Sequence, residues 1–300
     1  MLERDQYPAG VPCWVDTDQP DPDAAVEFYA GLFGWGFDDR MPADAPVKYS
    51  IAQLRGKDVA GVGGRPNDAP QTPVAWNTYV AVESADDSAA TAKDNGGSVI
   101  LEPFDVLDAG RMAVLADPEG AVFCAWQAKG SPGAVLVNEP GTWNFSELNT
   151  RDLDGAKEFY GAMFGWEASS FSFGGADYTM FRMPGYGEFL AERDPELYER
   201  QDEGGAPEGF ADAVAWLQPI TDDAASVSEA ARSYYDDQEA SPHWSITFAV
   251  DDADAAASQA AELGGTIDVA PFDAGPTRVA VVTDPQGATF TVSKFTPPNE

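Results

Sequence analysis

Two octapeptides decide how this 300-residue sequence folds: FYAGLFGW at residues 28–35 and FYGAMFGW at residues 159–166. Around the first copy, apolar side chains recur at positions i, i+3, i+4 and i+7, namely Ala25, Phe28, Tyr29 and Leu32. This spacing predicts an amphipathic helix that turns these side chains to one face. Asp21 suits the N-cap, Pro22 suits the first helical position, and the following glycine suits the helix end. We therefore expect both octapeptides to be core-facing helix ends, with Phe and Tyr packed on the sheet, rather than cofactor-binding motifs.

The octapeptides are part of a longer internal repeat. Three further segments of the first half recur in the same order in the second half: WNTYVAVESAD (76–86) matches WSITFAVDDAD (244–254), NGGSVI (95–100) matches LGGTID (263–268), and RMAVLADPEGAVF (111–123) matches RVAVVTDPQGATF (278–290). Ordered self-similarity indicates a duplicated structural unit. The offset between the copies grows between Trp166 and Trp244, which places an insertion at about residues 190–240 of the second copy.

Each copy shows the same succession of predicted elements: a strand, a helix and three strands, and then these five again. Alternating polarity marks the strands, and glycine closes the helices. We predict an α+β fold of two modules, residues 8–129 and 142–297, joined by the Gly- and Pro-rich linker 130–141. AVAWLQP (213–219) is the expected counterpart of the strand DVAGVGG (58–64), and the insertion is expected to form a lid or surface excursion.

Charge and composition exclude several partners. The chain has 51 acidic and 17 basic residues and a formal net charge of −34. A field of this sign repels phosphate backbones and anionic lipids, so we predict no nucleic-acid or membrane partner. The sequence lacks both a membrane-spanning apolar run and the basic-then-apolar start of a signal peptide, so a cytoplasmic protein is expected. An acidic, lysine-poor surface also suits concentrated salt, and we hypothesise a salt-loving host.

With the repeat established, the sequence resembles the vicinal-oxygen-chelate superfamily, which includes glyoxalase I, extradiol dioxygenases and bleomycin-resistance proteins. The resemblance rests on D-x(6)-FY-x(3)-FGW after the first strand, the strand ending in VESAD or VDDAD, the GG after the second helix, and DPxGxxF before the last strand, each found twice. More narrowly, the chain looks like tandem two-module proteins labelled glyoxalase-like. The resemblance implies two cupped mixed β-sheets, each built from two βαβββ motifs around a crevice, with the helices outside.

The resemblance also shows where metal-using members carry their four ligands, usually two His or Gln and two Glu. The matching positions are Trp14, Gly61, Asn77 and Cys124 in the first module, and Phe145, Trp216, Ser245 and Thr291 in the second. None of these is His, Glu or Asp, the side chains that such a metal needs. We therefore predict no metal and no other cofactor.

Three ionisable side chains lie near these positions. Asp16 and Glu147 each stand two residues beyond the first matched position, and the strand period of two aims both into their crevices. His243, the one histidine in the sequence, is a candidate for acid–base chemistry or a structural residue at the start of a strand. A buried carboxylate needs a partner, and the alternatives are a cationic ligand, a metal in an altered site, or Arg111 and Arg278.

Aromatic side chains indicate what a metal-free crevice binds. Flat ring surfaces suit planar or cationic small molecules, although the same rings can instead fill the crevice as core. The rings at the expected walls are Trp14, Tyr79, Trp126, Phe145 and Trp216. The two cysteines, Cys13 and Cys124, are too few for a disulfide framework and are predicted to be buried free thiols.

The leading hypothesis is a metal-independent protein that binds a small metabolite or drug. The expected ligand contacts are Trp14, Asp16, Asn77, Tyr79, Arg111, Cys124, Trp126, Phe145, Glu147, Trp216, Ser245, Arg278 and Thr291. One alternative is a glyoxalase-type lyase or isomerase, or a dioxygenase, with Asp16, Glu147 or His243 as the catalytic group. Another is a structural pseudo-dimer whose acidic surface meets a protein partner. Because two joined modules supply the pairing that single-module relatives obtain by dimerising, we expect a monomer.

Overall fold

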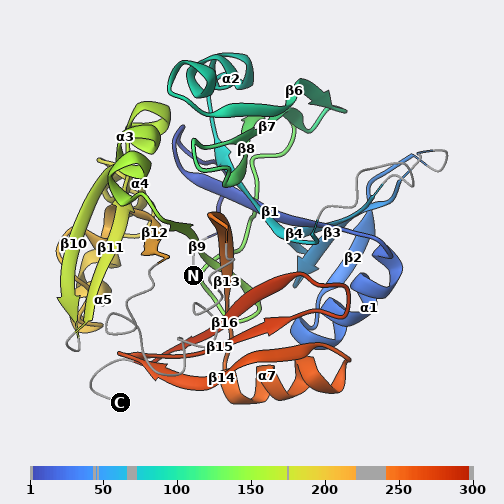
Figure 1. Cartoon of the computed structure of the whole chain (residues 1–300). Helices are drawn as coiled ribbons and strands as arrows, with labels where there is room; N and C mark the ends of the chain where they lie inside the picture. Colours follow the sequence, from blue (N-terminus) through green and yellow to red (C-terminus); the bar gives the residue numbers. More distant parts are fainter. Residues whose placement is uncertain are drawn as a thin grey trace.

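The computed structural model has the predicted α+β architecture of two tandem modules and describes residues 3–42, 45, 47–65, 73–173, 176–220 and 241–296. Each module contains one eight-stranded mixed sheet with helices packed against it (Figure 1). The strand orders are β2-β3-β4-β1-β5-β8-β7-β6 and β10-β11-β12-β9-β13-β16-β15-β14. Since both orders follow one pattern, the duplication seen in the sequence is also a duplication of topology.

The elements follow the predicted succession in both halves. The first sheet contains β1 (Pro12–Gln19), β2 (Gly36–Asp39), β3 (Tyr49–Leu54), β4 (Lys57–Gly64), β5 (Trp76–Ala81), β6 (Ser98–Val106), β7 (Gly110–Ala116) and β8 (Val122–Ala128). The second sheet contains β9 (Thr142–Thr150), β10 (Glu167–Phe173), β11 (Ala176–Arg182), β12 (Ala213–Pro219), β13 (His243–Ala249), β14 (Thr266–Ala274), β15 (Thr277–Thr283) and β16 (Thr289–Phe295). The helices are α1 (Pro22–Phe33), α2 (Ala85–Asp94), α3 (Leu153–Phe164), α4 (Tyr186–Ala191), α5 (Leu197–Glu203), the 3₁₀ helix η1 (Phe210–Asp212) and α7 (Ala253–Glu262). In the described ranges, no helix has the length and apolarity needed to cross a membrane.

The helices that contain the octapeptides begin and end where the sequence predicts. The Asp21 carboxylate caps α1 by accepting a backbone N–H at 3.1 Å, and Asp152 caps α3 in the same way at 2.9 Å. Both helices end at a glycine with positive φ, 69° at Gly34 and 72° at Gly165. Glycine is favoured there because no Cβ meets the preceding carbonyl in the left-handed conformation.

The octapeptide rings pack across the boundary between the modules, which extends the expectation that they pack on their own sheet. The rings of α1 share a buried core with α7 and with strands of the second module. Ring centroids lie 4.8 Å apart for Phe33 and Phe248, and 5.9 Å apart for Tyr29 and Phe290. A second core places α3 against α2, β7 and β8 in the same manner. These two junction cores bury the helix-bearing faces of both sheets against each other.

The same series of buried side-chain hydrogen bonds is found at each junction core. A tyrosine hydroxyl from the octapeptide donates to the aspartate of the other module's DPxG turn and accepts from an indole N–H of its own module. The two sets are Tyr29, Asp284 and Trp76, and Tyr160, Asp117 and Trp244. The distances are 2.8 and 3.1 Å in the first set and 3.1 and 2.9 Å in the second. The sequence repeat is therefore also the repeat that joins the modules.

The second module has additional helices before β12 in the chain. β12 is the counterpart of β4, as predicted: β12 runs parallel to β9, and β4 runs parallel to β1. Residues 183–212, between β11 and β12, contain α4, α5 and η1. Residues 221–240, the later part of the insertion predicted to form a lid or surface excursion, lie outside the described residues.

Candidate functional site

Each sheet has a face that points away from the junction cores, and we call it the crevice face. On β9, Leu148 lies in a junction core, so Glu147 and Phe145 point to the opposite face by strand alternation. On β12, Ala215 and Leu217 lie in the same core, which turns Trp216 to the crevice face. The predicted site residues of the second module therefore share one surface.

The strand register groups the predicted positions into two equivalent sets. In the first module the cross-strand neighbours are Asp16 with Gly61 and Asn77, and Tyr79 with Trp14 and Cys124. In the second module they are Glu147 with Trp216 and Ser245, and Thr247 with Phe145 and Thr291. The eight positions read from the sequence thus meet on two crevice faces, four on each.

These side chains do not fit the divalent ion that metal-using members of the resembling superfamily hold. The first set offers an indole, a glycine, an amide and a buried thiol, and the second offers two aromatic rings and two hydroxyls. Divalent ions of this kind take carboxylate and imidazole ligands. Within the described part of the chain, no group of three or more His, Cys, Asp or Glu side chains could hold a metal ion.

In the first module, protein donors surround the carboxylate of Asp16. It is 2% exposed and accepts hydrogen bonds from Tyr79 Oη at 2.6 Å, Tyr49 Oη at 2.8 Å and Asn77 Nδ2 at 2.9 Å. Trp14 Nε1 in turn donates to Tyr49 Oη at 3.0 Å. Burial raises the pKa of Asp16, and the three hydrogen bonds oppose that rise. The hydrogen-bonding capacity of this carboxylate is thus taken up by donors of its own module.

The aromatic rings of the first module fill its crevice as core. Trp14, Tyr79 and Trp126 are 9%, 6% and 8% exposed and belong to one buried cluster. The Trp126 ring lies over Gly110, where an added Cβ would come within 2.4 Å of it. Cys124 is a buried free thiol in the same cluster, and burial raises its pKa. Of the two interpretations of these rings, core filling describes the first module.

One residue difference separates the two crevices. In the first module Gly61 leaves room for Tyr49 to reach Asp16, since a Cβ there would lie 2.2 Å from Tyr49 Oη. In the second module Trp216 stands at this position. Tyr178 is the counterpart of Tyr49, because its neighbour on β11 pairs with the residue after Trp216. It lies against the indole, with ring centroids 6.4 Å apart.

Glu147 therefore has fewer protein partners than Asp16. Its one hydrogen bond from the described residues comes from Thr247 Oγ1 at 3.1 Å. Burial raises the pKa of Glu147, and the bond from Thr247 opposes that rise. Two residues along β9, Asn149 donates to Ser245 Oγ at 3.0 Å, while its buried Oδ1 has no hydrogen-bond partner in the described part of the chain. Among the described residues, the carboxylate of Glu147 thus keeps acceptor capacity that only one donor takes up.

Half-buried aromatic rings stand beside the carboxylate of Glu147. Four rings surround Trp216 with centroid distances of 5.5–6.4 Å: Phe145, Phe171, Tyr178 and Phe210. All five retain partial exposure, unlike the rings of the first module. The second crevice therefore combines an exposed aromatic surface with an under-satisfied carboxylate.

The arginines expected as partners of these carboxylates lie elsewhere. Arg111 pairs with Asp86 at 2.7 Å and with Asp105 at 3.4 Å. Arg278 makes the equivalent pairs, to Asp254 at 2.6 Å and to Asp273 at 3.1 Å. The expectation was wrong because acidic side chains at the start of α2 or α7 and on β6 or β14 stand closer to each guanidinium than the crevice carboxylates do.

His243 is the first residue of β13, and its ring contacts the backbone just before that strand. Its Nδ1 is 2.8 Å from the carbonyl oxygen of Ser241, and the ring is half-buried. No hydrogen bond or ion pair between described residues joins it to Glu147. The structural interpretation of this histidine accounts for its contacts.

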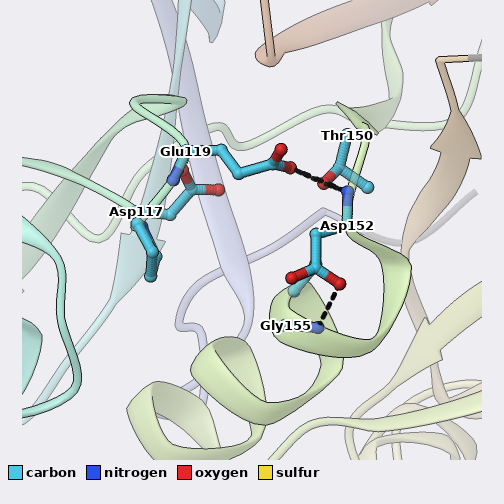
Figure 2. A pocket seen from close by; sticks show the side chains of 7 residues that line it. Asp117, Glu119, Thr150, Asp152 and Gly155 are labelled. Carbon is cyan, nitrogen blue, oxygen red and sulfur yellow. Dashed lines mark hydrogen bonds between the residues drawn. The ribbon is translucent and has the colours of Figure 1, made fainter.

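A small hollow lies at one junction between the modules, and hydrogen bonds around it join them (Figure 2). It has a volume of ≈ 30 Å³ and lies between the DPEG turn of the first module and the start of α3. Glu119 accepts the hydroxyl of Thr150 and the backbone N–H groups of Arg151 and Asp152, the latter two at 3.0 and 3.1 Å. At the other junction Gln286 bonds the backbone of Asp21 in the equivalent way. These contacts give the hollow a structural role.

Sequence reasoning missed several side chains of the second crevice: Asn149, Phe171, Tyr178, Phe210 and Thr247, as it missed Tyr49 in the first. Alternation along β9 and β13 could have indicated Asn149 and Thr247, since each stands two residues from a predicted position. The other four depend on the register between neighbouring strands or, for Phe210, on the insertion. No local pattern encodes those contacts.

Comparison with known proteins identifies the family. Residues 143–292 match the family described as Glyoxalase/Bleomycin resistance protein/Dioxygenase superfamily, and residues 14–126 match the one described as Glyoxalase-like domain. The chain therefore belongs to the glyoxalase/bleomycin resistance/dioxygenase superfamily and carries two of its domains in tandem.

Two named relatives match nearly the whole chain. It is 37% identical over 300 residues to "Putative glyoxylase CFP32" of Mycobacterium tuberculosis, with 99% of each chain covered. It is 32% identical over 299 residues to "Anthracycline biosynthesis protein DnrV" of Streptomyces peucetius, covering 96% of this chain and 94% of that one. Among solved structures, the Mn(II)-bound glyoxalase from Novosphingobium aromaticivorans shares the fold, with a TM-score of 0.56, 16% identity and coverage of 95% of this chain and 82% of that chain.

Proposed function

We propose that this protein binds a small planar molecule with hydrogen-bond donor groups in the crevice of the second module, residues 142–297, without a metal. One observation carries the proposal: Glu147 has a single hydrogen-bond donor among the described residues and stands beside five partly exposed aromatic rings. The rings offer stacking surface, and the carboxylate offers an acceptor in a setting shielded from water. In this proposal the first module, residues 8–129, is the structural partner.

Two observations support this assignment. Asp16, the equivalent of Glu147, has three donors, so the difference between the crevices follows from the residues around each carboxylate. One relative is named for anthracycline biosynthesis, and anthracyclines are compounds built on fused planar rings.

A second candidate function is acid–base catalysis by Glu147. Burial raises its pKa, which moves a carboxyl group towards the pH range where it can take up and release a proton. Another relative is named a glyoxylase, and such a lyase or isomerase needs a group that moves a proton. In this alternative Glu147 is the catalytic group.

Binding of 1,8-dihydroxyanthraquinone, measured by isothermal titration calorimetry, tests the first candidate. The probe has fused planar rings and two hydroxyl donors. Glu147→Met keeps the side-chain length and removes the acceptor, so affinity should fall by about 10- to 100-fold, the loss expected for a hydrogen bond to a carboxylate. Asp16→Asn is the matched control in the first module and should bind as the unmodified chain does. Equal losses in the two variants, or no saturable binding, contradict the proposal.

Three further measurements test the metal-free interpretation, separate the two candidates and identify the ligand. Titration with Mn²⁺ and Zn²⁺ should give no stoichiometric binding, and tight binding at either module would overturn the metal-free interpretation. Turnover of methylglyoxal mixed with a low-molecular-weight thiol, retained in Asp16→Asn and lost in Glu147→Gln, would favour the catalytic candidate. Mass spectrometry of small molecules released from the purified protein would identify the natural ligand.

A further inference from the structure

Exposed apolar side chains gather around β6, the strand at one edge of the first sheet (Figure 1). Eight large apolar side chains are exposed in the described part of the chain, and five of them belong to β6, the turn after it and β8: Ile100, Leu101, Phe104, Leu107 and Val122. We call these five residues the β6 surface; their exposed fractions are 39–58%. Monomeric proteins rarely expose a contiguous apolar patch of more than a few hundred Å², and larger patches mark interaction sites.

Strand register places part of the β6 surface on the crevice face. Leu101 and Phe104 pair with Val114 and Met112 of β7, and both of these residues pack on the cluster that fills the first crevice. Val122 stands two residues before a member of that cluster on β8, so strand alternation gives it the same face. The β6 surface therefore continues the apolar filling of the first crevice outward to the edge of the sheet.

The second module does not repeat this surface. On β14, the counterpart of β6, Asp268 stands in place of Ile100. Val269 stands in place of Leu101 and is 2% exposed, compared with 52%. The turn after β14 is one residue shorter and consists of glycine and proline, so it has no equivalent of Leu107. Because the two strands share one topology, the fold does not require exposed apolar side chains at this edge.

The carboxylates of β6 have basic partners close by. Glu102 pairs with Lys93 at 3.0 Å. Asp105 pairs with Lys129 at 2.9 Å and with Arg111 at 3.4 Å. Three of the 17 basic residues of the chain thus stand beside one strand. The net charge of −34 repels a second copy of the chain, and this local pairing lowers the repulsion at β6.

The backbone of β6 is not suited to pairing with a further strand. Register shifts interrupt its pairing with β7 between Val99 and Leu101 and between Leu101 and Phe104, and Pro103 has no N–H to donate. Bulges and proline block the addition of a strand at a sheet edge. A partner at this edge is therefore held by contacts between apolar side chains.

We propose that two copies of this chain associate through the β6 surface in concentrated salt. A two-fold axis beside β6 brings the surface against its own copy, so apolar side chains meet apolar side chains and the paired carboxylates stay at the rim. A basic partner would instead be drawn to the unpaired carboxylates elsewhere on the chain. This interface goes beyond ligand binding in the second crevice. It also departs from the monomer expected from the sequence, because that expectation considered only the pairing of modules within one chain.

The area of the β6 surface sets the strength of the association. Five side chains that are about half exposed offer on the order of 400 Å² per copy, within the range of functional surface patches. A standard interface buries roughly 800 Å² per partner, so the dimer is weak, with a dissociation constant on the order of 100 µM.

Sedimentation velocity of the full chain at about 2–200 µM, in about 0.1 M and 2 M KCl, tests the proposal. In 2 M KCl the sedimentation coefficient should rise with protein concentration towards that of a dimer. In 0.1 M KCl the chain should stay monomeric, because repulsion between two chains of net charge −34 is fully screened only in molar salt, where the Debye length is about 3 Å or less.

Matched variants locate the interface. Leu101→Glu and Phe104→Glu each place a charge in the β6 surface and should abolish the concentration dependence in 2 M KCl. Leu101→Asn adds no charge and should weaken association about tenfold or more, since both copies lose a buried apolar side chain. Ile267→Glu adds the same charge to the 37% exposed position on β14 and should dimerise as the unmodified chain does.

Circular dichroism at both salt concentrations checks that each variant is folded. Leu101→Glu should keep its affinity for 1,8-dihydroxyanthraquinone, so this interface and the second crevice can fail independently. A monomer at 200 µM in 2 M KCl, association that weakens as salt rises, unchanged association in Leu101→Glu, or equal losses in Leu101→Glu and Ile267→Glu would overturn the proposal.

Discussion

Replacing Tyr29 by Phe removes one oxygen atom from the junction between the modules and tests what the octapeptide contributes. Tyr29 is fully buried, and its hydroxyl links Asp284 of the other module to Trp76 of its own. After the substitution Asp284 keeps a bond from Gln19 at 2.8 Å and two backbone N–H donors at 2.9 Å. The indole N–H of Trp76 has no other acceptor among its described contacts and is left unpaired.

The expected cost follows from these two losses. A hydrogen bond to a charged group contributes about 1.5–3 kcal/mol, and a stranded buried donor costs about 1–3 kcal/mol. Because Asp284 keeps three other hydrogen-bond donors, loss of the tyrosine–aspartate bond should cost an amount at the low end of its range. With the unpaired indole N–H included, we expect the free energy of unfolding to fall by about 3 kcal/mol. For a chain of this size the melting temperature falls by roughly 2 °C per kcal/mol, which gives a decrease of roughly 6 °C.

Urea unfolding followed by tryptophan fluorescence measures the free-energy change, and differential scanning calorimetry measures the shift in melting temperature. Tyr178→Phe is the matched control, because no hydrogen bond between described residues involves its hydroxyl, and it should change stability by less than about 0.5 kcal/mol. If Tyr29→Phe costs no more than Tyr178→Phe, the tyrosine–aspartate contact does not hold the modules together and the reasoning is wrong.

Two other predictions concern titration and salt. Burial raises the folded pKa of Asp16, so its contribution to stability is present below the unfolded pKa of about 3.9 and is lost as pH rises through the folded value. Asp16→Asn cannot titrate, so its stability relative to the unmodified chain should increase with pH above about 4; a constant difference in urea midpoints from acid to neutral pH would refute this. With a net charge of −34, the unmodified chain should melt at a lower temperature after dialysis into dilute buffer than in molar salt, where repulsion is screened. An unchanged melting temperature would count against the salt-loving hypothesis.

The contrast between the two modules bears on the choice between binding and structural roles. Both modules inherit the same strands, yet one carboxylate is enclosed by donors and the other is not. The difference depends on Gly61 and Trp216, which hold equivalent positions beside the two carboxylates. A duplicated fold thus keeps one crevice as core while the other retains exposed rings.

The sequence by itself determined the repeat, the element order and the positions that face the crevices. These are readable because they depend on local regularities: helical spacing around Phe28, a cap and a glycine at the helix ends, and strand alternation that carries Asp16 and Glu147 to equivalent places. It also located the eight positions where the superfamily's metal ligands would stand, by counting from the octapeptide.

Only the tertiary structure decided what surrounds those positions. The reach of Tyr49 across Gly61 to Asp16, the pairing of Arg111 with Asp86 and Asp105, and the packing of octapeptide rings on the opposite module all join residues distant in sequence. Such contacts depend on strand register and on how two apolar faces meet, and neither is encoded in a local pattern.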